Sequence, residues 1–256
     1  MIDKKKIKEF VRRRYGEIAA QAKEEGTTSC CPSSSCCPPE EACSAAALYS
    51  SEDLAGLPSS VIGVTLGCGN PTAIAGLKPG EVVLDLGCGG GIDLFLAAQK
   101  VGPTGKAIGL DMTQEMIELV QKNAQKVGAQ NVEFRLGEME DLPFEDESID
   151  VIMSNCVINL SPDKGKVFSE AYRVLKPGGR MVISDLVAEG DLPPAVKESV
   201  EAWAGCVAGA LDKREYREKI EAAGFVDLEM RVGGSTMQEG NLQWVKHIDV
   251  EAHKPA

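Results

Sequence analysis

Histidine is almost missing from this 256-residue chain, which has only His247 and His253, both near the carboxyl end. Neither lies close to a motif described below, so we expect each at the surface or on a strand edge. Positive charge is also scarce, since 27 Lys and Arg stand against 39 Asp and Glu for a net charge of -12. The basic runs are limited to Lys4–Lys6 and Arg12–Arg14. Because phosphate contacts need concentrated positive charge, we expect no nucleic-acid partner.

Long apolar runs are missing as well. The start MIDKKKIKEF has no apolar segment of the kind a secretory signal carries, and no window approaches the ~18 apolar residues of a membrane span. The sequence therefore predicts a cytoplasmic protein with no membrane partner. In that compartment nine cysteines favour thiol chemistry or metal binding over a disulfide framework, although a regulatory disulfide stays open.

The first fifty residues differ in composition from the rest. Apolar residues recur at helical spacing over 3–24, which predicts an amphipathic helix. Residues 26–41, GTTSCCPSSSCCPPEE, are mostly Ser, Cys and Pro, which favours a mobile, cysteine-rich linker. A short helical turn is expected at 44–50, followed by a loop that reaches Asn70.

From about residue 80, strands and helices alternate, the pattern of a parallel sheet with covering helices. The predicted elements are strands 81–86, 106–111, 132–136, 149–154 and 180–185, helices 92–101, 114–128 and 164–175, and a turn at 176–179. Residues 189–212 interrupt the alternation, and a helix at 213–223 resumes it. Strands 226–232 and 245–252 have no helix between them, so we expect them to pair antiparallel.

A glycine-rich loop follows the first predicted strand. Asp85 lies near the end of that strand, and Gly87, Gly89 and Gly91 precede the helix, so the backbone can approach a ligand where side chains would collide. Such a loop alone is equally consistent with a tight structural turn. Asp111, at the end of the second strand, adds an acid that can accept both hydrogen bonds from a ribose diol.

Further candidate cofactor contacts follow the second and third strands. They are Met112 after the second strand and Gly137, Glu138 and Met139 after the third. Together with the glycine loop they describe an adenosine held across the carboxyl ends of the first strands. The pattern predicts a nucleoside cofactor.

In these segments the chain resembles class I S-adenosylmethionine-dependent methyltransferases. The resemblance rests on VVLDLGCGGGID, GLDMTQEMI, the acidic position after the third strand, DLPFEDESIDVIMSNCVI and VLKPGGRMVISD, over roughly residues 75–190. The loop reads G-C-G-G-G rather than G-x-G-x-x-G, which favours S-adenosylmethionine over a nicotinamide dinucleotide. The resemblance implies an α/β, Rossmann-like, mostly parallel sheet of seven strands in the order 3-2-1-4-5-7-6 with the last strand antiparallel. It also implies that Asn155 borders the cofactor.

This resemblance divides the chain into three parts. Residues 1–50 form the amino-terminal helix and the cysteine-rich linker. Residues 51–188 form the cofactor-binding methyltransferase core. Residues 189–256 form a helical, substrate-binding insertion and the strands that complete the sheet.

Three cysteines stand apart from the others: Cys68 in VTLGCGNP, Cys156 in SNCVINL and Cys206 in WAGCVAGAL. Each lies where the predicted fold borders the methyl donor, namely before the first strand, after the fourth strand and in the insertion. A single cysteine is more often a small buried hydrophobic residue, and Cys88 in the glycine loop is expected to be one. Read together, the three motifs resemble those of the arsenite S-adenosylmethionine methyltransferases.

The chemistry implied by this resemblance suits three thiolates. Trivalent arsenic is thiophilic, so Cys68, Cys156 and Cys206 are expected to bind it as a pyramid and to serve as both the catalytic and the metalloid-ligating residues. The lone pair of the arsenic then attacks the methyl group, and no general base is needed. The expected substrates are arsenite and then methylarsenite, and the expected role is arsenic detoxification.

Methylation formally oxidises arsenic, so a thiol reductant such as thioredoxin or glutathione is the expected partner. The linker cysteines are Cys30, Cys31, Cys36, Cys37 and Cys43. The resemblance implies that one of them pairs with Cys68, without determining which. Adjacent cysteines could instead capture metal, although their spacing is awkward for one tetrahedral zinc site.

Two other functions stay open at this point. One is a methyltransferase of a quinone, a sterol or another small carbon substrate, whose activity would not depend on Cys156 or Cys206. The other is a non-enzymatic thiol protein that sequesters arsenite or transition metals. An intact set of Gly87, Gly89 and Asp111 argues against the second, because a protein that only sequesters metal needs no cofactor site.

Overall fold

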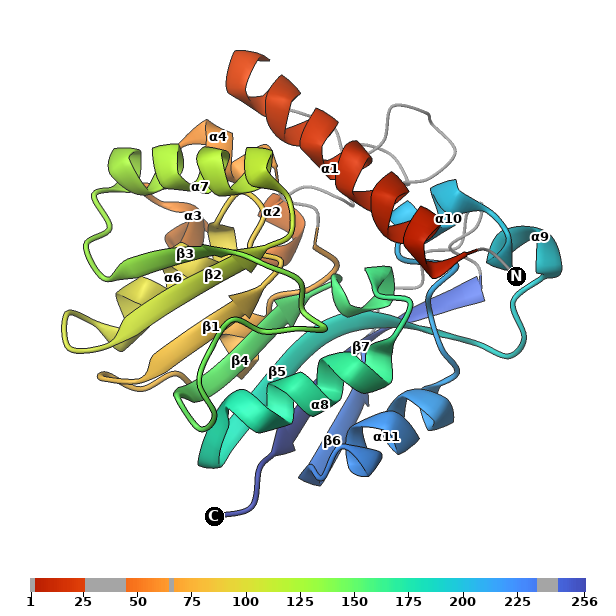
Figure 1. Cartoon of the computed structure of the whole chain (residues 1–256). Helices are drawn as coiled ribbons and strands as arrows, with labels where there is room; N and C mark the ends of the chain where they lie inside the picture. Colours follow the sequence, from red (N-terminus) through yellow and green to blue (C-terminus); the bar gives the residue numbers. More distant parts are fainter. Residues whose placement is uncertain (1–2, 26–44, 65–66, 234–243) are drawn as a thin grey trace.

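The computed structural model describes residues 3–25, 45–64, 67–233 and 244–256. Its centre is a seven-stranded sheet in the order β3-β2-β1-β4-β5-β7-β6 (Figure 1). The strands are β1 (Val82–Leu86), β2 (Lys106–Asp111), β3 (Val132–Leu136), β4 (Ile149–Asn155), β5 (Leu175–Ala188), β6 (Val226–Val232) and β7 (Val245–His253). β1 to β5 pair in parallel, and β7 is antiparallel to both β5 and β6. The predicted class I methyltransferase sheet is confirmed.

Helices cover both faces of the sheet. The longer helices are α1 (Lys4–Glu25), α6 (Ile92–Val101), α7 (Gln114–Val127), α8 (Lys164–Val174) and α11 (Lys213–Ala222). Because side chains alternate along a strand, Leu84 and Ile152 pack on one face with α8 and α11, whereas Val83 and Val151 pack on the other with α6 and α7. The alternating sequence pattern thus produces two apolar layers, with the sheet between them.

Shorter helical segments connect these elements. They are α2 (Ala45–Leu48), α3 (Ser51–Leu54), α4 (Ser59–Ile62), α5 (Pro71–Ile74), the 3-10 turn η1 (Ile158–Leu160), α9 (Pro194–Lys197) and α10 (Val200–Ala204). The loop expected from residue 51 to Asn70 is therefore wrong in part, because it contains α3 and α4. A capping box begins α3, in which Ser50 and Asp53 satisfy each other's backbone amides.

The turn expected at residues 176–179 is also wrong, because these residues lie inside β5. Pairing with β4 passes from Ile149 opposite Leu175 to Val151 opposite Arg180, so the intervening residues of β5 form a bulge. The predicted helix before it ends at Val174 rather than at Leu175.

Helix α1 crosses the top of the molecule in Figure 1. Near its start, Ile7 and Val11 pack in the cluster that contains Cys156 and Cys206. Further along, Ile18 packs against α7. The apolar stripe predicted for this helix therefore joins two parts of the molecule. No helix in the described part of the chain is long and apolar enough to cross a membrane. The predicted linker at 26–41 lies outside the described residues.

Candidate active site

A cavity lies at the carboxyl ends of β1, β2 and β4, and residues of α1 form part of its lining. Eight of the predicted site residues line it, namely Gly87, Gly89, Asp111, Met112, Gly137, Met139, Asn155 and Cys156. The others, Asp85, Gly91, Glu138, Cys68 and Cys206, lie outside that lining. The carboxyl edge of a parallel sheet is where such folds bind ligands.

The glycine loop is forced into its shape by its own neighbours. Gly87, Gly89 and Gly91 all have positive φ, at 70°, 48° and 98°. A Cβ at Gly87 would lie 2.5 Å from a methyl carbon of Val157, and one at Gly91 would lie 2.6 Å from the ring of Phe95. Glycine is therefore required at both positions by conformation and by space.

Three carboxylates surround this loop. Asp111 accepts hydrogen bonds from the amides of Thr113 at 2.9 Å and Gly89 at 3.3 Å. Burial raises the pKa of Asp111, and these backbone hydrogen bonds oppose the rise. Burial and the charges of Asp93 and Asp111 also raise the pKa of Asp85. Three acidic groups gathered around one loop favour a cationic ligand that carries hydroxyl donors.

The acid that faces the cavity after β3 is Glu140. Glu138 instead pairs with two residues of α1, at 2.7 Å from Lys8 and 2.8 Å from Arg12. Glu140 is buried, lines the cavity, accepts a 2.6 Å hydrogen bond from Ser161 and lies 3.1 Å from Lys8. The chain reverses here, with an antiparallel bridge between Glu138 and Asp141, and Glu140 rather than Glu138 belongs to the cavity lining. A cofactor contact by Glu138 stays a prediction.

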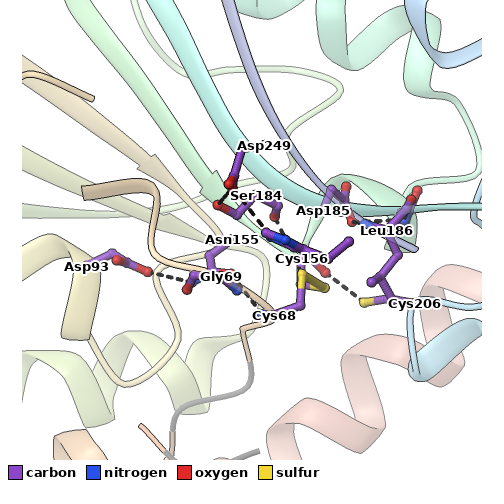
Figure 2. The surroundings of a disulfide bond; sticks show 12 residues. Cys68, Gly69, Asp93, Asn155, Cys156, Ser184, Asp185, Leu186, Cys206 and Asp249 are labelled. Atoms are coloured by element: carbon purple, nitrogen blue, oxygen red, sulfur yellow. Dashed lines mark hydrogen bonds and ion pairs between the residues drawn. A yellow bond between two sulfur atoms is a disulfide. The ribbon is translucent and has the colours of Figure 1, made fainter. Parts of the chain in front are cut away.

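The three isolated cysteines come together beside this cavity (Figure 2). Cys68 and Cys156 form a disulfide, with 5.7 Å between their Cα atoms. The thiol of Cys206 donates to the carbonyl oxygen of Cys156 at 2.7 Å. The fold thus gathers residues from the segment before β1, the end of β4 and the turn after α10. We call this group the cysteine corner.

Two residues of the cysteine corner have unusual backbone conformations. Cys156 and Cys206 both have φ of 62°, a left-handed conformation that side chains with a Cβ disfavour. In the described part of the chain the other non-glycine residues of this kind are Glu147 and Asp227. Such conformations cost roughly 1–2 kcal/mol each and cluster at functional sites.

In this state the cysteine corner offers a single free thiol. Burial raises the pKa of Cys206, the charge of Asp185 raises it further, and Lys164 opposes both. Within the described residues, no group of three His, Cys, Asp or Glu side chains is arranged to hold a metal ion. A three-sulfur site therefore requires that the bond between Cys68 and Cys156 first be reduced. The five linker cysteines lie outside the described residues.

Two buried titratable residues, Lys164 and Asp185, act on Cys206 through their charges. The Lys164 ammonium donates to the carbonyl of Ser161 at 3.0 Å and lies 5.5 Å from the centre of the Trp203 ring. Burial lowers the pKa of Lys164 to about 8 and raises that of Asp185 to about 7. Sequence patterns did not identify either group, because nothing in their local sequence distinguishes them from surface charges.

His247 does not lie at a surface or strand edge, so that prediction is wrong. It belongs to β7, between β5 and β6, and its side chain is 12% exposed. A Cβ on Gly69 would lie 2.6 Å from its Nε2 atom, so the imidazole packs against the segment that carries Cys68. Cys88 is buried as predicted.

Sequence patterns also did not identify Asp93 and its hydrogen-bond partners Tyr49 and Thr72. Asp93 is 5% exposed and accepts hydrogen bonds from Thr72 at 2.7 Å, Tyr49 at 3.0 Å and Asn155 at 3.0 Å. Asn155 in turn binds the backbone of Cys68 at 3.0 Å. In the sequence Asp93 resembles an ordinary acidic residue in the first turn of a helix, and only its burial distinguishes it.

Comparisons with known proteins agree with this geometry. Residues 77–224 match a family model described as a methyltransferase domain. An arsenite methyltransferase of Halobacterium salinarum is 44% identical over 81% of this chain and 55% of its own length. One of Aquipseudomonas alcaligenes is 42% identical over 63% of this chain and 48% of its own. The chain thus spans about half the length of these curated relatives.

A solved structure is similar as well. It is that of an arsenic(III) S-adenosylmethionine methyltransferase from Chlamydomonas reinhardtii, with a TM-score of 0.65 and 35% sequence identity. The match covers 80% of this chain and 72% of that one.

Proposed function

Because the chain belongs to the arsenite methyltransferase family, we propose that it transfers methyl groups from S-adenosylmethionine to trivalent arsenic, first in arsenite and then in methylarsenite. One observation carries the proposal, namely that Cys68, Cys156 and Cys206 meet at the edge of the cofactor cavity. A small carbon substrate would not require three sulfur atoms there. Soft thiolate ligands are what trivalent arsenic prefers.

The residues of the cavity fit this cofactor. S-adenosylmethionine, when bound, supplies an electrophilic methyl group on a positively charged sulfur. The carboxylates of Asp93 and Asp111 in the lining suit that charge, and Asp111 is the acceptor for the ribose hydroxyls. Gly87 and Gly89 let the backbone approach the ligand closely, while Met112, Gly137 and Met139 contribute to the remaining lining.

Substrate binding begins with reduction of the bond between Cys68 and Cys156. A thiol reductant such as thioredoxin or glutathione donates two electrons and two protons, and two thiols result. Arsenite then exchanges its three hydroxyl groups for three sulfurs, releasing three waters. Cys156 and Cys206 orient the arsenic lone pair, while α1 and Trp203, which pack in the same cluster, exclude water. Holding the arsenic and the methyl group in reacting geometry lowers the barrier.

We extend the proposal to the rest of the chain. Residues 1–50 supply the helix over the cavity and the linker cysteines, 51–188 bind the cofactor, and 189–256 supply Cys206 and complete the sheet. The linker cysteines return arsenic to the trivalent state by giving up two electrons as a thiol pair becomes a disulfide. A reducing cytoplasm suits this chemistry.

The test is an incubation with arsenite, S-adenosylmethionine and glutathione, followed by chromatographic separation of the arsenic species. Methylated arsenic should appear in proportion to S-adenosylhomocysteine. Binding of S-adenosylmethionine without methylated arsenic would favour a small carbon substrate. Binding of arsenite without binding of S-adenosylmethionine would favour a sequestering protein.

A further inference from the structure

The side-chain amide of Asn155 holds the segment that carries Cys68. Its Oδ1 atom accepts hydrogen bonds from the amides of Cys68 at 3.0 Å and Gly69 at 3.2 Å. Its Nδ2 atom donates to the carbonyl of Gly69 at 2.8 Å. Because Asn155 directly precedes Cys156, one side chain sets the distance between these two cysteines.

Space as well as hydrogen bonding fixes this arrangement. A Cβ at Gly67 would lie 2.4 Å from the amide carbon of Asn155, and one at Gly69 would lie 2.6 Å from the Cβ of Ser184. The glycines on both sides of Cys68 therefore let the backbone close around the amide. The position of Cys68 depends on which way that amide faces.

Asp93 supports the direction of this amide, together with the backbone of Cys68 and Gly69. A carboxylate only accepts hydrogen bonds, so the atom of Asn155 that faces Asp93 Oδ2 at 3.0 Å must be Nδ2. Tyr49 and Thr72 donate to the same carboxylate, at 3.0 Å and 2.7 Å, and keep it in place. Nδ2 of Asn155 also donates to the Tyr49 hydroxyl at 3.1 Å, and Oδ1 faces the amides of Cys68 and Gly69.

We propose that Asp93 is a positioning residue for arsenite methylation, which acts through Asn155 to place Cys68 beside Cys156. This role rests on the proposed function for its substrates. Tyr49, Asp93 and Asn155 also line the cofactor cavity, so the same hydrogen bonds connect that cavity with the cysteine corner. Neither Asp93 nor Thr72 need contact the arsenic.

The experiment compares two substrates in the full chain. Arsenite takes three sulfurs, whereas methylarsenite has one position filled by carbon and takes only two, so it does not need Cys68. In Asp93→Asn the charged acceptor is lost and the new side chain can present an amide nitrogen to Asn155, which weakens the support of its amide. We expect kcat/KM for arsenite to fall about tenfold or more, and that for methylarsenite by no more than about threefold.

Asp150→Asn is the matched control. Asp150 lies near the other end of β4, where its carboxylate accepts from the amide of Val82 at 2.8 Å. Asp150→Asn should leave the ratio of kcat/KM for arsenite to kcat/KM for methylarsenite unchanged. An equal loss on both substrates in Asp93→Asn, or an unchanged ratio, overturns the proposal. If Asp93→Asn does not fold, Thr72→Val is used instead, because it removes a single donor to Asp93. The ratio of kcat/KM for arsenite to that for methylarsenite should then fall about threefold, and an unchanged ratio overturns the proposal.

A second readout needs no methylation and so separates this proposal from the function itself. The reduced protein is treated with oxidised glutathione, which accepts two electrons as the Cys68–Cys156 bond reforms, and the bond is followed by mass spectrometry. Asp93→Asn should slow this step about tenfold, and Asp150→Asn should not. If the parent protein methylates no arsenical yet shows this difference, only the proposed function fails. Equal rates in the parent and Asp93→Asn overturn the positioning role.

Discussion

The glycine loop and the cysteine corner both contain residues with left-handed backbone, but only the residues of the corner carry a Cβ, which makes that conformation unfavourable. In the loop, Gly87, Gly89 and Gly91 adopt positive φ without a Cβ to oppose it. In the corner, Cys156 and Cys206 adopt φ of 62° with their side chains in place. The loop therefore uses residues suited to this conformation, whereas the corner keeps two cysteines in a conformation that a Cβ disfavours, as residues at functional sites often do.

The two regions also differ in their fixed partners. Asp111 accepts hydrogen bonds from two backbone amides, and neither contact involves a sulfur atom. Cys68 and Cys156 instead bind each other, and only reduction of that bond frees both sulfurs. Under the proposed function, the cofactor region needs no covalent change before it binds its ligand, whereas the cysteine corner must first be reduced.

The largest expected effects come from removing sulfur from the corner. Cys156→Ser and Cys206→Ser should abolish methylation of arsenite and methylarsenite, because too few soft donors remain to orient the lone pair. Cys68→Ser should lose arsenite methylation and retain part of the activity on methylarsenite. Arsenic speciation after a fixed incubation measures all three. If Cys156→Ser methylates either arsenical at the parent rate, the thiolate mechanism is wrong and a small carbon substrate is favoured.

Loss of the acid in the cofactor region should be the next largest effect. Asp111→Ala removes charged hydrogen bonds to the ribose, worth about 1.5–3 kcal/mol, or roughly 10- to 100-fold in affinity for S-adenosylmethionine. Titration calorimetry measures the affinity, and circular dichroism confirms that the fold survives. Unchanged affinity would remove Asp111 from the cofactor site.

Substitution within the glycine loop should separate conformation from space. Gly87→Ala meets Val157 and also a φ of 70°, whereas Gly178→Ala meets a φ of 76° with nothing within 4 Å. We expect Gly178→Ala to cost about 1–2 kcal/mol of unfolding free energy and Gly87→Ala to cost at least about 1 kcal/mol more. Urea unfolding of both variants tests this. Equal costs would mean that Val157 moves aside freely.

The smallest predicted effect concerns strain in the corner. Cys206→Ala and Cys206→Gly both remove the sulfur, but only glycine relieves the left-handed backbone. The glycine variant should be more stable by roughly 1 kcal/mol. At Cys88, which is not among the residues with positive φ, the order should reverse and alanine should be the more stable. The same order at both positions would show that Cys206 is not strained.

The sequence predicted the fold well because the alternation of strands and helices is a local signal that repeats along the chain. It predicted that Asp111 lies at the cavity because the end of a strand fixes where its side chain lies. It could not separate Glu138 from Glu140, since a turn after β3 decides which one faces the cavity. Nor could it identify Asp93, whose role depends on contacts with Tyr49 and Asn155, far away in sequence.

Helix α1 has a consequence for the order of events during turnover. One end of its apolar stripe packs in the cysteine corner, its other end packs on α7, and Lys8 between them lines the cofactor cavity. One helix thus borders both the cofactor cavity and the cysteine corner. Under the proposed function, a displacement of α1 that opens the cofactor cavity would also expose the cysteine corner to water, so exchange of the cofactor and hydration of the arsenic site would be coupled.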